Sequence, residues 1–254
     1  MQKTEYHPEN YWTEVAQRIR GRGASNVIAG DDEPYYRYKR AQFLQLLREV
    51  DFSNKEVLEV GCGPGGNLVE IWKQHPKKLC GADISAEMVN LAKKNAPHEI
   101  EIVKTNGTVL PYADKSFDVV MTATVLQNNT DEEMLNKLIG ELCRVSRGSV
   151  VIFERIEDTI KGDELCLGRP ISYYAQLFHT YGFQLDNSRF INVRVSYYVS
   201  GFIRKVFNRR DRKEGEPLTV FSIYLQRLTL PFTKFLDKIF TSDKDVARLV
   251  FHRK

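Results

Sequence analysis

The chain has 254 residues, 42% of them hydrophobic, and a formal net charge of +4 at neutral pH. This length and apolar content predict one principal domain with additions, large enough to bury a sizeable core. The net charge is too small to imply nucleic-acid binding by itself. No apolar stretch is long enough to span a bilayer, and the first residues lack the hydrophobic region of a signal peptide, so we expect a cytoplasmic protein.

Four cysteines, Cys62, Cys80, Cys143 and Cys166, are distributed along the chain. They include no C-x-x-C pair, and no His stands at metal-ligand spacing from them. This pattern favours reduced thiols and no bound metal.

A helix is predicted in the N-terminal region, where residues 30–34 combine acidic residues with a proline. Acids at a helix N-terminus and Pro in its first turn are typical of a helix start. An apolar stripe follows at helical spacing, and Tyr36 and Arg40 continue it. We expect residues 1–50 to form an N-terminal helical lid whose Tyr36 and Arg40 face the body of the protein.

Residues 57–68 read Val-Leu-Glu-Val-Gly-Cys-Gly-Pro-Gly-Gly-Asn-Leu, which predicts a buried strand, a glycine turn and the start of a helix. Glycines can adopt positive φ and carry no Cβ, so backbone N–H groups here can approach a ligand at the positive end of the helix. Two interpretations are open at this point. The glycines satisfy the dinucleotide pattern G-x-G-x-x-G, whereas Glu59, Gly61, Gly63 and Gly65 match the acidic signature E-x-G-x-G-x-G of S-adenosylmethionine-dependent methyltransferases.

The following segments alternate between strands and helices, as a doubly wound parallel sheet requires. A second strand, residues 78–83, ends in Asp83, at the position about twenty residues after the loop where an acid can accept both ribose hydroxyls of a nucleotide cofactor. Ser85 is expected to cap the next helix, which carries Met88 on its apolar face. Further strands are predicted at residues 100–104, 117–122, 149–153 and 183–193. Further helices are predicted at residues 131–145, with Asp131 as the N-cap, and at residues 170–181.

The third strand is followed by Asn106-Gly107-Thr108 and then by Leu-Pro-Tyr-Ala-Asp-Lys-Ser-Phe-Asp-Val-Val at residues 110–120. The glycine loop, Asp83 and these two segments follow one another in a characteristic order. By this order, the run from Val57 to about Asp158 resembles class I S-adenosylmethionine-dependent methyltransferases. The resemblance implies an α/β fold, a Rossmann-like three-layer sandwich with a mostly parallel seven-stranded sheet and an antiparallel last strand. It also implies S-adenosylmethionine as the cofactor and S-adenosylhomocysteine as its product.

The same resemblance predicts the cofactor site. Glu59 and the loop would flank the methionine moiety, Asp83 would hold the ribose, and Asn106-Gly107 would lie beside the adenine. In this family a leading helix covers the cofactor, so Tyr36 and Arg40 are candidates to reach the methionine carboxylate, with simple packing as the alternative. The complete set of expected cofactor-binding residues is Tyr36, Arg40, Glu59, Gly61, Cys62, Gly63, Gly65, Asp83, Ile84, Met88, Asn106, Gly107, Thr108, Thr122, Ala123 and Gln127.

A general base should lie at the carboxyl edge of the sheet, where the acceptor would meet the activated methyl group. Glu154 and Arg155 are the first polar residues after the apolar fifth strand. Glu154 is therefore a candidate base, and Arg155 would hold an anionic acceptor or form a salt bridge with a neighbour. His179, on the next helix, is a second candidate base. No metal-binding carboxylates are evident near the fourth strand, so metal-free catalysis is expected.

Residues 245–254 resemble the antiparallel last strand of the family. This assignment leaves residues 51–195 as the methyltransferase core and residues 196–244 as a helical insertion on the substrate side, because ligands bind at the carboxyl ends of parallel strands. The first half of the insertion is basic, and the second half is aliphatic and aromatic. Residues 204–240 could therefore form a solvated face, a site for an anionic acceptor, or a contact with a membrane surface.

Together these features predict a metal-independent methyltransferase that acts on a small-molecule or lipid-like acceptor at an O or N atom. No N-P-P-Y or D-P-P-Y segment follows the fourth strand, so methylation of DNA bases is not expected. The alternative is a cofactor-binding but catalytically inactive protein whose additions bind a partner. The glycine loop and Asp83 fit both functions.

Overall fold

The computed structural model describes residues 7–20 and 33–254. Its centre is a seven-stranded sheet in the order β3-β2-β1-β4-β5-β9-β8. Six strands run parallel, and β9 runs antiparallel to both of its neighbours. The strands are β1 (Glu56–Val60), β2 (Lys78–Asp83), β3 (Glu101–Lys104), β4 (Phe117–Ala123), β5 (Ser146–Ile156), β8 (Phe183–Phe190) and β9 (Asp245–Arg253). The predicted fold class is confirmed.

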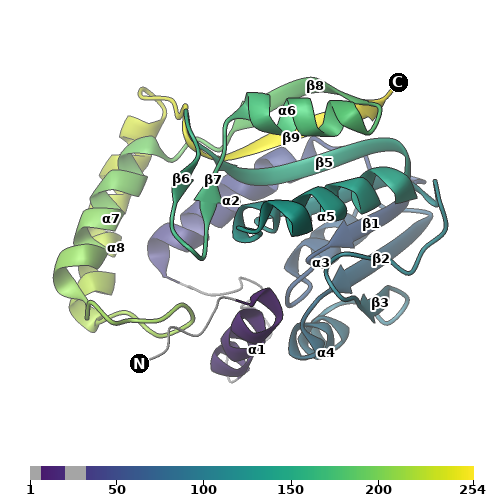
Figure 1. Ribbon diagram of the computed structural model, residues 1–254. Helices are drawn as coiled ribbons and strands as arrows, with labels where there is room; N and C mark the ends of the chain where they lie inside the picture. The colour runs from purple at the N-terminus through teal and green to yellow at the C-terminus, as the bar shows by residue number, and fades with distance from the viewer. Residues whose placement is uncertain (1–6, 21–32) are drawn as a thin grey trace.

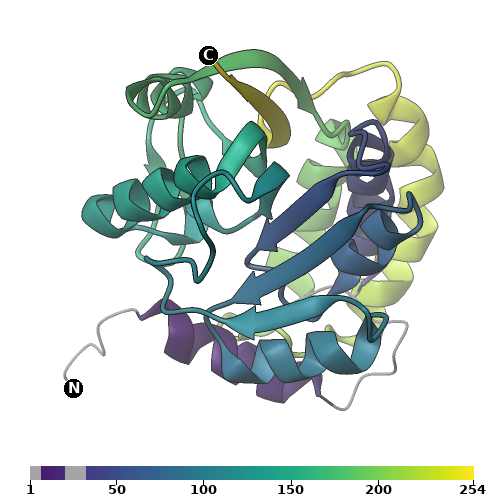
Figure 2. The same ribbon diagram turned by 90° about the vertical axis from the view of Figure 1, so that its right-hand side faces the viewer.

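Helices cover both faces of this sheet, which gives three layers (Figures 1 and 2). One apolar core lies between the sheet and helices α5 and α6, and the other lies between the sheet and helices α2, α3 and α4. These helices are α2 (Pro34–Arg48), α3 (Gly66–Trp72), α4 (Ala86–Asn95), α5 (Glu132–Val145) and α6 (Ile171–Thr180). A further helix, α1 (Pro8–Ile19), packs on α4 through a third, smaller apolar cluster.

The burial of both faces of β5 explains why its sequence is continuously hydrophobic. Val150 and Ile152 belong to the core under α5 and α6, whereas Val151 and Phe153 belong to the core on the other face. Successive side chains of a strand point to opposite faces, so a strand covered by helices on both sides needs apolar residues at every position.

Two predicted helix caps are confirmed. The Ser85 hydroxyl accepts a hydrogen bond from the Met88 N–H at 3.3 Å, and Asp131 Oδ1 accepts one from the Met134 N–H at 2.9 Å. Each cap satisfies one of the N–H groups that have no partner inside the first turn of a helix. The predicted helix start at residues 30–34 falls partly outside the described residues, and α2 begins at Pro34.

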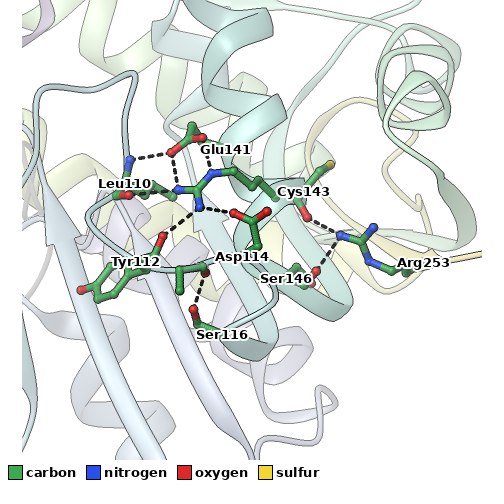
Figure 3. Close-up of polar contacts among 10 residues, drawn as sticks. Leu110, Tyr112, Asp114, Ser116, Glu141, Cys143, Ser146 and Arg253 are labelled. Atoms are coloured by element: carbon green, nitrogen blue, oxygen red, sulfur yellow. Dashed lines mark hydrogen bonds and ion pairs between the residues drawn. The ribbon is translucent and has the colours of Figure 1, made fainter.

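Arg144 of α5 holds residues 110–116 against this helix. Figure 3 shows the polar contacts around Leu110, Tyr112, Asp114 and Glu141. The Arg144 guanidinium donates to the Leu110 and Tyr112 carbonyl oxygens at 3.1 and 2.8 Å, and it pairs with Asp114 at 2.7 Å. Glu141, one turn earlier on α5, accepts from Arg144 Nε at 2.6 Å and from the Leu110 N–H at 2.7 Å. The Leu-Pro-Tyr-Ala-Asp motif therefore has a structural role.

Some boundaries differ from the prediction. Strand β5 is longer than residues 149–153, because its pairing with β9 runs from Ser149 to Ile156. Strand β8 ends at Phe190, before residue 193. A short hairpin of β6 (Lys161–Gly162) and β7 (Leu167–Gly168), which the sequence analysis did not predict, follows β5.

Two helices, α7 (Arg194–Phe207) and α8 (Val220–Asp237), connect β8 to β9. They lie side by side at one flank of the molecule, on the left in Figure 1. The Asp237 carboxylate, at the end of α8, accepts hydrogen bonds from the N–H groups of Val195 and Ser196 at 2.6 and 3.2 Å. Asp237 thus caps α7 from the neighbouring helix, and the two helices form one hairpin.

Candidate active site

The glycine loop between β1 and α3 has the backbone that its sequence predicts. Gly61, Gly63 and Gly65 have φ values of 74°, 52° and 88°, in the left-handed region that favours glycine. The Asp83 carboxylate, at the end of β2, accepts hydrogen bonds from the Gly63 N–H at 2.8 Å and from the Ser85 N–H at 2.9 Å. Asp83 therefore joins the loop to the start of α4.

A first cavity lies over this loop. Its walls are largely apolar and come from the loop, from the residues after β2, β3 and β4, and from helices α1, α4 and α5. The lining residues include Pro8, Trp12, Val60, Gly61, Gly63, Asp83, Ile84, Met88, Thr105, Gly107, Ala123, Thr124, Val125, Asn128, Asn129, Met134 and Leu138.

A second cavity adjoins the first, because both are lined by Trp12, Gly61, Gly63, Ala123, Thr124 and Asn128. The second cavity continues between α2, the carboxyl end of β5, the start of β9 and helix α7. Its other lining residues include Tyr36, Lys39, Arg40, Phe43, Cys62, Asn67, Gln127, Arg155, Cys166, Ile191, Tyr197, Glu214, Asp245 and Val246.

A chain of buried polar groups borders the second cavity. Arg40 Nη1 donates to Asn67 Oδ1, and Asn67 Nδ2 donates to Glu59 Oε1, each at 2.5 Å. Burial raises the pKa of Glu59 to about 8 and lowers that of Arg40 to about 10. Among the described residues, nothing pairs with Glu59 Oε2 or with Arg40 Nε and Nη2, although these atoms are buried. Such groups require a partner.

Burial also affects Asp83. Its side chain is almost completely removed from solvent, which raises its pKa to about 6, while the N–H groups of Ser85 and Gly63 act in the opposite direction. Asp83 can therefore change its protonation state in weakly acidic solution.

The structure places Glu154, the first candidate base, away from both cavities. Glu154 lies inside β5, is fully buried, and lines neither cavity. Its carboxylate accepts three backbone hydrogen bonds at 3.0–3.1 Å, from the N–H groups of Val125, Leu126 and Gln127. Burial raises its pKa to about 7. Glu154 thus fixes the turn after β4, including the short helix η1 (Leu126–Asn128), which helps to line both cavities.

His179, the second candidate base, also lines neither cavity. Its Nε2 lies 3.2 Å from the Lys254 Nζ. Lys254 follows the end of β9, which pairs with the beginning of β8 at Phe183. His179 therefore lies at the edge where the parallel strands begin, opposite the glycine loop.

Arg155 lines the second cavity and also pairs with Glu157 at 2.8 Å, so the predicted salt bridge between neighbours is present. The predicted residues that line one or both cavities are Tyr36, Arg40, Gly61, Cys62, Gly63, Asp83, Ile84, Met88, Gly107, Ala123 and Gln127. Five predicted residues do not line them, namely Glu59, Gly65, Asn106, Thr108 and Thr122. Asn106 instead closes a turn, because its Oδ1 accepts from the Thr108 and Val109 N–H groups at 3.0 and 2.8 Å.

Sequence reasoning missed the contribution of α1. Its Trp12 lines both cavities. The helix is held over the loop because Val15, Ala16 and Ile19 pack with Met88 of α4. An apolar pattern on α1 predicts burial of one face, but it gives no signal of which element will cover that face.

Comparison with known proteins agrees with this geometry. Residues 57–148 match the family model described as Methyltransferase domain. Residues 57–148 therefore carry a methyltransferase domain of the class I, S-adenosylmethionine-dependent type. Norajmaline N-methyltransferase of Rauvolfia serpentina is 31% identical over 131 residues, which are 49% of this chain and 44% of that protein. Fatty-acid O-methyltransferase of Mycolicibacterium smegmatis is 32% identical over 99 residues, which are 37% of this chain and 35% of that protein.

The matched region therefore spans less than half the length of these relatives. Another match is named a tRNA U34 carboxymethyltransferase, so the relatives differ widely in acceptor. Among solved structures, magnesium protoporphyrin IX methyltransferase of Synechocystis PCC 6803 with bound S-adenosylhomocysteine has the same fold, with a TM-score of 0.62 and 13% sequence identity. That likeness covers 97% of this chain and 98% of the other.

The methyltransferase family uses S-adenosylmethionine as its methyl donor. In residues 7–20 and 33–254, no group of three or more His, Cys, Asp or Glu side chains could hold a metal ion. The helices in this same part of the chain include none that combines the length and apolar character of a membrane span.

Proposed function

We propose that this methyltransferase binds S-adenosylmethionine in the first cavity and part of the second, and that it methylates a small-molecule or lipid-like acceptor bound in the rest of the second cavity. The observation that carries this proposal is the junction of the two cavities at Gly61, Gly63, Ala123 and Thr124. A donor and an acceptor that meet at one wall can be held in line for transfer.

The buried polar groups fit such a donor. Arg40 Nε and Nη2 need partners and Arg40 lines the second cavity, so the carboxylate group of a methionine moiety would supply one. Asp83 is suited to accept hydrogen bonds from ribose hydroxyls, and Ile84 and Met88 offer apolar walls beside it. Glu59 lines neither cavity, so in this assignment it acts by holding Asn67, which lines the second cavity.

When bound, S-adenosylmethionine supplies a methyl group on a positively charged sulfur, which already activates the methyl group for transfer. The chain therefore has to orient the acceptor and exclude water. Trp12 and Tyr36 supply aromatic surface for these tasks, because they line the second cavity on two sides. Neither side chain needs to form a covalent bond with the acceptor.

The charge of the second cavity supports an acceptor that carries an anionic group. Lys39, Arg40 and Arg155 line it, against the carboxylates of Asp245 and Glu214. Lys39 Nζ pairs with Asp245 Oδ2 at 2.6 Å. An acceptor carboxylate or phosphate could pair with the cations of this wall. Whether an oxygen or a nitrogen atom is methylated depends on the acceptor itself.

The alternative, a protein that binds the cofactor without catalysing transfer, is favoured by one observation. Neither predicted general base lies in the cavities, since Glu154 is occupied by backbone N–H groups and His179 lies at the opposite edge of the sheet. An acceptor that is already nucleophilic, such as an amine or a carboxylate, needs little help from a base, so active transfer remains the proposal.

The test has two stages. Calorimetric titration with S-adenosylmethionine measures cofactor binding. Incubation of the protein and S-adenosylmethionine with polar and lipid metabolite extracts, each tested separately, measures release of S-adenosylhomocysteine. We expect binding, release with one extract, and a product heavier by one methylene in mass spectrometry. Binding of S-adenosylmethionine without release of S-adenosylhomocysteine in any extract would overturn the proposal of an active enzyme and favour the catalytically inactive alternative. Absence of binding would overturn both.

A further inference from the structure

The α7–α8 hairpin has an unusual distribution of polarity. The buried residues of α8 are Ser222, Gln226, Leu230, Thr233 and Asp237, of which only Leu230 is apolar. Those of α7 are Ser196, Ser200 and Ile203. A helix on the surface of a water-soluble domain normally buries its apolar stripe instead.

Hydrogen bonds account for the buried polar residues. Ser196 Oγ donates to Asp237 Oδ2 at 2.5 Å and also lies 2.8 Å from Thr233 Oγ1. Gln226 Oε1 accepts from the backbone N–H of Tyr35, on α2, at 3.1 Å. Asn208 Nδ2 donates to Ser222 Oγ at 3.0 Å. These hydrogen bonds attach the two helices to each other and the hairpin to α2, so polar contacts help to fix its orientation.

Many large apolar side chains of the hairpin are exposed. We define the outer face as the side chains on these two helices that are large, apolar and more than half exposed. They are Tyr198, Phe202 and Val206 on α7 and Val220, Phe221, Tyr224, Leu228, Phe232 and Phe235 on α8. Spacings of three and four residues align most of them along each helix. An aromatic and aliphatic surface of this kind marks a site of interaction.

The charge on the same helices identifies the kind of partner. Lys205, Arg227 and Lys238 lie on or at the end of these helices, whereas Arg194 pairs with Asp243 and Lys234 lies over the Tyr38 ring of α2. The only acidic residue within either helix is Asp237, which is buried. An apolar face with flanking cations complements an anionic lipid surface, where headgroups meet the cations and acyl chains meet the apolar side chains.

A second copy of the chain fits this surface less well. A symmetric dimer places the same patch on both sides of the contact, so the cations of one hairpin would approach those of the other. Like charges at close range oppose association.

We propose that the outer face of the α7–α8 hairpin docks onto anionic lipid membranes. This inference goes beyond the proposed function, because methyl transfer does not require docking. Its consequence for the site is spatial: Tyr197 of α7 lines the second cavity, next to Tyr198 on the outer face. Docking would therefore bring the acceptor side of the enzyme to the membrane.

The experiment is co-sedimentation of the full chain with vesicles of phosphatidylglycerol and phosphatidylcholine in equal parts, and with vesicles of phosphatidylcholine alone. We expect binding to the anionic vesicles, weakened by added salt. Leu228→Glu combined with Phe232→Glu should reduce this binding about tenfold or more, because two apolar contacts are lost and two negative charges are added. Val109→Glu is the control, because Val109 is similarly exposed outside the hairpin.

A second pair of variants isolates the charge. Arg227→Gln with Lys238→Gln should weaken binding to the anionic vesicles by about tenfold. Lys93→Gln with Lys94→Gln, on the exposed side of α4, changes the net charge equally and should leave binding unchanged. Cofactor titration of every variant separates docking from the methyltransferase site, because we expect the same cofactor affinity throughout.

Three results would overturn the docking proposal. The first is a wild-type chain that does not sediment with either vesicle. The second is equal vesicle binding by wild type and by the Leu228→Glu, Phe232→Glu variant. The third is sedimentation velocity showing a dimer that these two substitutions dissociate, with vesicle binding absent, which would assign the outer face to self-association.

Discussion

In the central sheet, β5 buries Val150, Val151, Ile152 and Phe153 completely or almost completely, whereas in the α7–α8 hairpin Phe232 is 66% exposed and Asp237 is buried. Both regions are regular and hydrogen-bonded, so the difference lies in what covers them. Helices of the same chain cover both faces of the sheet. On the hairpin, most of the buried side chains are polar, whereas many large apolar side chains are exposed. Burial in the sheet therefore stabilises the fold, whereas exposure on the hairpin is available for a partner.

The largest expected effect tests the sheet. Leu58, on β1, is fully buried in the core under α5 and α6. Leu58→Ala removes its packing contacts and leaves a cavity, so we expect the free energy of unfolding to fall by about 2 to 5 kcal/mol. Urea denaturation followed by circular dichroism measures this change. A loss below about 1 kcal/mol would show that the core relaxes around the missing side chain.

The glycine loop tests whether the same sheet positions a ligand. A Cβ on Gly61 would overlap the Val125 side chain, and its φ of 74° already disfavours a larger residue. We expect Gly61→Ala to weaken cofactor binding by about 2 to 3 kcal/mol, in part through a left-handed backbone cost of about 1 to 2 kcal/mol. Gly182→Ala is the matched control, because Gly182 has a φ of 78° but nothing lies within 4 Å of its added Cβ.

Calorimetry with S-adenosylmethionine compares the two variants. Gly182→Ala should retain the affinity of the wild type, even if it is less stable. Equal affinities for both variants would contradict the assignment of the loop to the cofactor site.

Much of the sheet and loop could be predicted from the sequence, because local rules apply there. Alternating strands and helices, the Ser85 and Asp131 caps and the glycine turn each depend on a few neighbouring residues. The location of Asp83 after β2 follows from the same periodicity. These signals need no knowledge of distant contacts.

Other parts could not be predicted, because they depend on tertiary packing. Glu154 was expected at the mouth of the site, but pairing with β9 extends β5 past it and buries it. The position of His179 on a helix gave no information about which edge of the sheet it would reach. Trp12 reaches the cavities through the packing of α1 on α4, across a large separation in sequence. The sequence left residues 204–240 with three possible roles, a solvated face, a site for an anionic acceptor or a membrane contact, and only the structure shows which side chains of α8 are covered.

The polar interior of the hairpin gives the next prediction. Asp237 accepts hydrogen bonds from the N–H groups of Val195 and Ser196 and from the Ser196 hydroxyl. Asp237→Asn keeps the size of the side chain but removes its charge and turns an acceptor into a donor, so we expect a loss of about 1.5 to 3 kcal/mol in the free energy of unfolding. Asp211→Asn, at an exposed acid in the connecting loop, is the control. Equal stability of both variants would mean that the hairpin does not rely on its polar interior.

A pH dependence of cofactor binding should follow from Asp83. Its pKa is raised to about 6 by burial, so the carboxylate is ionised above this pH and protonated below it. Ribose hydroxyls donate to the ionised form, and we therefore expect affinity to fall about tenfold, or about 1.4 kcal/mol, between pH 7 and pH 5. The stability of the unliganded protein should depend on pH in the opposite direction. The raised pKa of Asp83 stabilises the fold at low pH, and this contribution is lost as the pH rises through about 6.

Asp83→Asn is the control for this profile, since Asn does not titrate. Cofactor affinity of the variant should be lower at pH 7 and nearly independent of pH across the same range. A wild-type profile that matches the variant would exclude Asp83 as the titrating group.

The smallest expected effect completes the comparison between the two regions. Leu228 is chemically identical to Leu58, but it lies on the outer face of the hairpin and is 64% exposed. Leu228→Ala removes little buried surface, so its effect on the free energy of unfolding should stay within about 0.5 kcal/mol. Urea denaturation of the unliganded, lipid-free protein provides the measurement. A loss as large as that of Leu58→Ala would mean that Leu228 is covered by the chain itself in solution, and the outer face would then belong to the fold.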